Sequence, residues 1–85
     1  MPAKDLRIPE RVRKRVVKLP LKIQERVIKS LVAIKTNPLL GTKLHGQLGN
    51  YYKLRLGDYR IVYYFDTKKS MVVIVKIEHH HGVYK

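Results

Sequence analysis

The sequence predicts an α+β fold, in which an N-terminal helical hairpin packs on one face of a three- to four-stranded, mainly antiparallel sheet. Apolar residues recur at helical spacing between residues 9 and 35, whereas from residue 50 onward apolar and polar residues alternate as they do in strands. Turn signals at 57–58 and 66–70 divide this second half into three strands. Because 85 residues have room for only one core, we expect residues 1–85 to form a single domain.

Two prolines divide the first half of the chain. Residues 3–8 are either a short first strand or an extended lead-in to a helix that begins at Pro9, since proline is favoured in the first helical turn. Leu19-Pro20 interrupts the helical spacing, and a second helix is predicted from about Pro20 to Lys35. Its apolar stripe, which needs a partner surface, consists of Ile23, Val27, Leu31 and Ile34.

Residues 51–64 predict a tight β-hairpin around a two-residue turn at Gly57-Asp58. With this turn, Arg55 lies opposite Arg60, and Lys53 shares their face because side chains alternate between the two faces of a sheet. Like charges directly opposite each other destabilise a sheet, so an anion bound between the two arginines would remove a penalty. We therefore expect the helices to cover the other face and to leave this cationic face open to a ligand.

The tyrosines of the hairpin divide between the two faces by the same alternation. Tyr51 and Tyr64 fall on the cationic face, where they are candidates for stacking on the bases of a nucleic acid, if that is the anion that the face binds. The core face receives Tyr52, Tyr59 and Tyr63, which we expect to contribute to packing.

A further strand is predicted for residues 71–79. Its first half is nearly all apolar, which indicates a strand covered on both faces. Strict alternation places Val73 and Val75 on the core face, together with the apolar residues of the hairpin. The same alternation directs His80 to the face that carries Lys53, whereas His79 points away from it.

Charge is the most unusual property of the composition. Nineteen Lys and Arg oppose six Asp and Glu, and the net charge of +13 favours a polyanionic partner such as nucleic acid. The sequence contains no cysteine, which excludes disulfides and thiolate metal sites, and its longest apolar runs are too short to span a membrane. Because the N-terminus also lacks the apolar core of a secretory signal, we expect a cytoplasmic protein, and we expect no metal or cofactor.

These elements resemble the RelE family of type II toxin–antitoxin systems over nearly the whole chain. The most specific part is residues 52–63, and the supporting parts are Lys18-Leu19-Pro20, Leu44-His45-Gly46 and Val83-Tyr84. The resemblance implies a RelE-like fold and a ribosome-dependent endoribonuclease that cuts mRNA in the A site and inhibits translation. It also implies a co-encoded, RelB-like antitoxin, which would inhibit either by covering the cations or by displacing a terminal element.

The resemblance also implies roles for individual residues. Lys53 and Arg55 correspond to the family's paired cations, Arg60 to the arginine that holds the scissile phosphate, and Tyr84 to a tyrosine that stacks on a base. The family usually has an arginine four residues before that tyrosine, where this sequence has His80. Some relatives of this fold use a C-terminal histidine as a general acid or base, so the replacement is compatible with activity.

Metal-independent RNA cleavage needs a base for the 2′-hydroxyl, cations for the charge on the phosphorane and an acid for the leaving oxygen. Arg55 and Arg60 suit the electrostatic role, because arginine is always charged and can grip phosphate with two parallel hydrogen bonds. Lys53 is the candidate base, since neighbouring cations disfavour its protonated form. The candidate acid is His80 or His81, because imidazole titrates nearest neutrality, and His81 is also a candidate for RNA contact ahead of metal binding.

Two other functions stay open. The related ParE branch shares the fold and poisons DNA gyrase without cutting RNA, but it generally lacks the cation set of this hairpin. The chain could also be a non-catalytic nucleic-acid-binding module, that is, a toxin that lost activity when His80 replaced the arginine. Without the resemblance, a solvated face of an amphipathic hairpin would be the better explanation of Lys53, Arg55 and Arg60.

Overall fold

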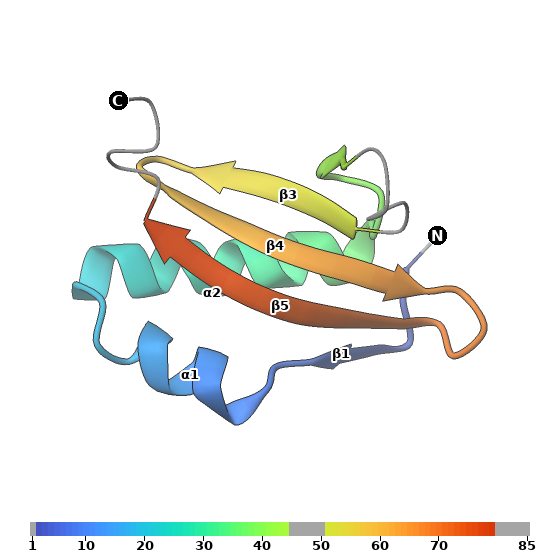
Figure 1. Ribbon diagram of the computed structural model, residues 1–85, viewed down its shortest axis with the longest axis horizontal. Coiled ribbons are helices and arrows are strands. Elements are labelled where there is room, and N and C mark those ends of the chain that lie inside the picture. The colour runs from blue at the N-terminus through green and yellow to red at the C-terminus, as the bar shows by residue number, and fades with distance from the viewer. Residues whose placement is uncertain (1, 45–50, 80–85) are drawn as a thin grey trace.

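The computed structural model of the protein describes residues 2–44 and 51–79. Two helices and five strands follow one another along the chain (Figure 1). Their bounds are β1 (Asp5–Arg7), α1 (Glu10–Val16), α2 (Leu21–Thr36), β2 (Thr42–Lys43), β3 (Tyr51–Leu56), β4 (Tyr59–Asp66) and β5 (Met71–His79).

The strands form one sheet in the order β1-β5-β4-β3-β2. β1 pairs with β5 in parallel, and the other neighbours are antiparallel. The predicted fold class, two helices packed on a mainly antiparallel sheet, is confirmed, but the sheet has five strands rather than three or four. The difference comes from β1 and β2, which have only three and two residues and leave little periodicity in the sequence.

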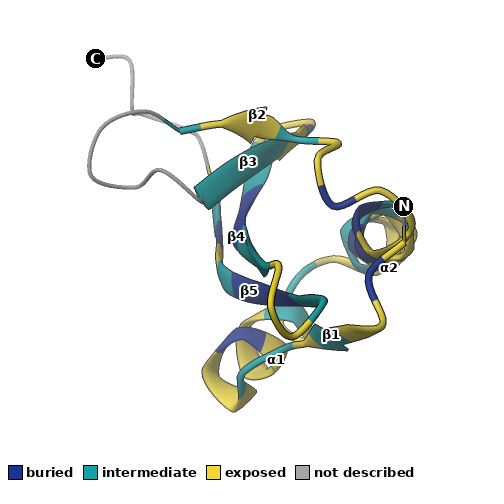
Figure 2. Ribbon diagram, turned by 90° about the vertical axis from the view of Figure 1, so that its right-hand side faces the viewer, coloured by how far each residue is buried: buried dark blue, intermediate teal, exposed yellow. Residues whose placement is uncertain are grey.

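Both helices begin where a proline precedes them. Pro9 and Pro20 occupy the N-cap positions, and α2 ends at Thr36, two residues before Pro38. α2 lies across the concave side of the curved sheet, whereas α1 lies next to β5 at the β1 edge (Figure 2). Both helices contribute to one core, with Val12 from α1 and the stripe of α2 packed against the strands.

The hairpin of β3 and β4 has the predicted register. Arg55 pairs with Arg60 and Lys53 pairs with Val62 across a two-residue turn. Gly57 has a φ of +61°, and no such left-handed φ occurs at Asp58, which is the pattern of a type II′ turn with glycine in its first central position. The turn therefore fixes which side chains of the hairpin share a face.

The predicted core face of β5 is wrong for Val73 and Val75. Val62 and Tyr63 are adjacent on β4, but their partners on β5 are Lys76 and Ile74, which are not adjacent. Val75, between these two partners, is therefore an extra, bulged residue. A bulge shifts the alternation of side chains by one residue, and Val73 consequently pairs with Tyr64 on the open face. The β5 residues that reach the core are Val72, Ile74 and Ile77.

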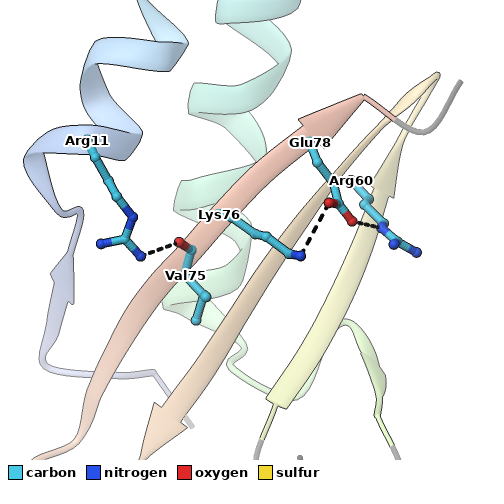
Figure 3. Close-up of polar contacts among 5 residues, drawn as sticks. All are labelled: Arg11, Arg60, Val75, Lys76 and Glu78. Atoms are coloured by element: carbon cyan, nitrogen blue, oxygen red, sulfur yellow. Dashed lines mark hydrogen bonds and ion pairs between the residues drawn. The ribbon is translucent and has the colours of Figure 1, made fainter.

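An arginine of α1 binds the backbone of β5 at the bulge. Nη2 of Arg11 donates a hydrogen bond of 3.1 Å to the carbonyl oxygen of Val75 (Figure 3). β1 pairs with residues 71–73 of β5, so this contact lies just beyond the end of the parallel ladder. The arginine thus satisfies a carbonyl group that β1 does not reach.

Tyr63 joins the core to the segment that leads into β2. Its side chain is fully buried, and its hydroxyl donates to the carbonyl oxygen of Pro38 and accepts from the amide of Gly41, both at 2.9 Å. A side chain at Gly41 would meet the carbonyl oxygen of Lys53 at 2.6 Å, so β2 can approach β3 only with glycine there. Burial raises the pKa of Tyr63 above its ordinary 10.0, and the hydroxyl stays protonated at neutral pH.

Candidate functional site

The open face of the sheet carries charged side chains in two rows that cross three strands. In one row Arg55, Arg60 and Glu78 are successive partners on β3, β4 and β5. In the next row Lys53 and Lys76 lie on either side of Val62 in the same way. The rows border a hollow of about 190 Å³, which is lined by Leu44, Lys53, Arg60, Val62, Lys76 and Glu78.

Glu78 is the acidic member of this group. One of its carboxylate oxygens, Oε2, accepts a hydrogen bond from Nε of Arg60, and the other, Oε1, lies 3.3 Å from Nζ of Lys76 (Figure 3). Burial opposes ionisation of Glu78, but the hydrogen bonds from Arg60 and Lys76 outweigh it and hold the pKa of Glu78 below its ordinary value. The carboxylate is therefore ionised at neutral pH.

Glu78 also changes the expected electrostatics of the hairpin. Arg55 and Arg60 are directly opposite each other, as predicted, which is a repulsive arrangement. On the far side of Arg60, however, Glu78 supplies an opposite charge from within the chain. The repulsion between the two arginines, which a bound anion was expected to relieve, is therefore partly offset by the protein itself. Arg55 is exposed and makes no such ion pair in the described part of the chain.

Two tyrosines form the row next to the cations. Tyr51 and Tyr64 are partners on β3 and β4, their ring centroids lie 5.3 Å apart, and their planes are inclined by 41°. Both are half-buried, so each ring keeps part of its surface in contact with solvent. On the opposite face, Tyr52 and Tyr59 pack against the core around Tyr63, as predicted.

The register brings together Lys53, Arg55 and Arg60 on one face with Tyr51 and Tyr64, as the hairpin pattern predicted. His80, His81 and Tyr84, the remaining residues predicted for the site, lie outside the described residues.

Sequence reasoning assigned no role to Lys76 and Glu78. Their positions two residues apart near the end of β5 indicated the correct face, but the contact with Arg60 depends on the register between β4 and β5.

The histidine that ends β5 faces the other way. His79 pairs with Tyr59, and their rings meet edge to face with centroids 4.8 Å apart. Within residues 2–44 and 51–79, His, Asp and Glu side chains form no cluster of three that could hold a metal ion. In the same residues, neither helix is long and apolar enough to span a membrane.

Comparison with known proteins places this fold among the toxins of type II toxin–antitoxin systems. Residues 4–84 match a family model described as the ParE toxin of the type II toxin–antitoxin system parDE. The chain belongs to this family, which is part of the RelE/ParE superfamily that the sequence was found to resemble. A comparison with curated protein sequences found no match.

Several solved structures of RelE toxins are similar to the chain. One matching chain, from the RelE–RelB complex of the archaeon Pyrococcus horikoshii, is 26% identical in sequence with a TM-score of 0.81, and the match covers 96% of this chain and 99% of that one. The RelBE2 toxin–antitoxin complex from Mycobacterium tuberculosis is 28% identical with a TM-score of 0.79, covering 93% of each chain. The isolated RelE toxin of Escherichia coli is 28% identical with a TM-score of 0.78, covering 93% of this chain and 88% of that one.

Proposed function

We propose that this toxin is a metal-independent endoribonuclease that cuts mRNA on translating ribosomes in the cytoplasm. The observation that carries the proposal is the gathering of Lys53, Arg60 and Lys76, from three adjacent strands, around one hollow of the open sheet face. The similarity to RelE toxins supports the same activity. A net charge of +13 further favours a polyanionic substrate.

The geometry suits a phosphate on the cations and bases on the tyrosines. Residues that share a face along a strand are about 7 Å apart, so the row of Tyr51 and Tyr64 lies one such step from the row of Lys53. Aromatic rings at this position could stack on unpaired bases of an mRNA. Arg55 and Arg60 would stabilise the charge that grows on the phosphorane, and Lys53 would take the proton of the attacking 2′-hydroxyl.

The remaining roles in the proposal belong to the residues that follow β5. His80 or His81 would protonate the leaving 5′-oxygen, because imidazole can donate a proton near neutral pH. Tyr84 would stack on a base, and His81 would contact RNA if His80 is the acid.

A RelB-like antitoxin is the proposed protein partner. The similar structures include toxin–antitoxin complexes from bacteria and archaea, which supports a partner of this type. An antitoxin that is acidic where it touches this domain would be attracted by the same charge that favours RNA. The other proposed partners are the ribosome and its mRNA.

Inhibition of DNA gyrase is the second candidate function. It is favoured by the description of the matching family, which names the ParE toxin. The ParE branch generally lacks the cation set of Lys53, Arg55 and Arg60, which this chain carries on its open face, and we therefore rank gyrase inhibition second.

Primer extension on mRNA from translating ribosomes distinguishes the two functions. We expect the wild-type protein to create new 5′ ends within the A-site codon, and we expect Arg60→Ala to reduce their rate of formation by about 100-fold or more, as does the loss of one transition-state donor in other enzymes. Lys29→Ala is the matched control, because it removes an exposed cation from the outer surface of α2. Wild-type protein that creates no ends, or ends that persist undiminished in Arg60→Ala, would contradict the proposal, and loss of supercoiling in a purified gyrase assay would favour the second function.

A further inference from the structure

The guanidinium group of Arg60 is held from one side only. Its Nε donates to Glu78, and its two terminal nitrogens point away from that carboxylate (Figure 3). In the described part of the chain, Nε is the only nitrogen of this side chain that makes a hydrogen bond. The end of the guanidinium is therefore available to a ligand.

This arrangement suits the recognition of a phosphate. Arginine has five N–H donors, of which the four on the terminal nitrogens can form two parallel hydrogen bonds with phosphate oxygens. A free arginine side chain loses about 2 kcal/mol of rotamer entropy when it is ordered. A carboxylate that holds Nε orders the side chain before the substrate arrives, at no cost to the terminal donors.

Glu78 is itself held in place from two directions. It is the direct cross-strand partner of Arg60 in the ladder of β4 and β5, and Lys76, two residues earlier on the same face, binds its second oxygen. Only 27% of its side chain is exposed. Both carboxylate oxygens are engaged by cations, so Glu78 is poorly suited to remove a proton from a substrate.

The negative charge of Glu78 opposes the binding of a phosphodiester, although its hydrogen bond orders the arginine that would bind it. Three cations and one carboxylate line the hollow, which leaves a net charge of +2 to meet a phosphodiester. Glu78 repels that phosphodiester and lowers the affinity for it. A residue that lowers affinity and nevertheless orders a phosphate ligand should show its benefit in the rate of the chemical step rather than in binding.

We propose that Glu78 is a positioning residue, which orients Arg60 so that its terminal nitrogens grip the scissile phosphate, and that Glu78 stays bound to Nε while they do so. The inference rests on the proposed RNA-cleaving function. It differs from a simple counter-ion, which would leave Arg60 when the phosphate arrives.

Two substitutions of Glu78 separate orientation from charge. Glu78→Gln removes the charge but keeps an oxygen that accepts from Nε, whereas Glu78→Ala removes both. Glu25→Ala, on the exposed surface of α2, is the control for the change in net charge. Single-turnover cleavage on mRNA-programmed ribosomes gives the rate at saturating toxin and the toxin concentration at half-saturation.

We expect Glu78→Ala to lower the saturating rate by about 10- to 100-fold, the usual effect of a misoriented group, with no rise in the half-saturating concentration. Glu78→Gln should stay within about threefold of the wild-type rate. The positioning role is refuted if Glu78→Ala cleaves as fast as wild type, or if Glu78→Gln is as slow as Glu78→Ala while thermal melts show all variants folded.

A second measurement does not depend on cleavage. The Nε–H resonance of Arg60 is followed by NMR during titration with inorganic phosphate. In wild type and Glu78→Gln we expect the Nε–H to be protected from exchange with solvent. Its resonance should shift as phosphate binds, and the proton should stay protected when phosphate saturates the site. In Glu78→Ala we expect the Nε–H to be unprotected. The inference is overturned if phosphate moves the wild-type resonance to its position in Glu78→Ala, or if the wild-type resonance does not respond to phosphate. If the NMR result is as expected but the mRNA stays uncut, only the proposed function is contradicted.

Discussion

Removal of one hydroxyl group, by Tyr63→Phe, should strongly destabilise the protein. The hydroxyl is buried and makes two hydrogen bonds of 2.9 Å, to the carbonyl oxygen of Pro38 and from the amide of Gly41. Each of the two backbone groups left without its partner costs about 1–3 kcal/mol, so the free energy of unfolding should fall by about 2–6 kcal/mol. In a domain of this size, 1 kcal/mol corresponds to about 4–8 °C, and Tm should therefore fall by roughly 10 °C or more.

Urea unfolding followed by circular dichroism measures this loss, and Tyr52→Phe is the matched control. The ring of Tyr52 stacks on that of Tyr63 with centroids 5.5 Å apart, but in the described part of the chain its hydroxyl makes no hydrogen bond. We expect the control to change stability by less than about 0.5 kcal/mol, as do most substitutions away from such contacts. Equal effects of the two substitutions would show that the hydroxyl of Tyr63 does not secure the segment before β2.

Three further predictions test the turn, the bulge and the acidic residue of the site. Gly57→Ala should cost about 1–2 kcal/mol in urea unfolding, because the residue has a φ of +61°; an unchanged midpoint would contradict the assigned turn. Ile74→Ala should lower the free energy of unfolding by about 2–5 kcal/mol and Val75→Ala by clearly less, because Ile74 is fully buried and Val75 is not. The reverse order would contradict the bulge and support strict alternation along β5. Because the pKa of Glu78 is lower in the folded protein than its ordinary value of 4.5, its ionised carboxylate stabilises the fold above that pH. The stability advantage of wild type over Glu78→Gln should therefore disappear as the pH falls through the lower pKa of the folded state. An advantage that is constant from pH 7 to pH 2 would refute this assignment.

The register of the hairpin could be predicted from the sequence because it is a local property. A two-residue turn with glycine leaves one way to align β3 with β4, and that alignment fixes the face of Lys53, Arg55 and Arg60. The helix boundaries were predictable for a similar reason, since Pro9 and Pro20 act on the residues next to them.

The bulge in β5 could not be predicted in the same way. Residues 71–75 are all apolar, so no polar side chain reports a shift of the alternation, and the extra residue becomes visible only in the pairing with β4. The ion pair of Arg60 with Glu78 depends on that pairing too. For this reason the cations of the site were found from sequence, whereas the acid that orders one of them was not.

The contact between Arg11 and Val75 has a consequence for how other chains can approach the sheet. Unpaired backbone at the edge of a sheet can recruit a strand from another molecule, which leads to aggregation. Here the outer strands β1 and β2 are only three and two residues long, and the carbonyl of Val75 beyond β1 is already bound by Arg11. The outer strands themselves therefore offer few backbone groups to an extended segment of another chain, and at Val75 the carbonyl is already taken. Residues 54–56 of β3, which β2 does not pair with, are where such a segment would find strand backbone beside it.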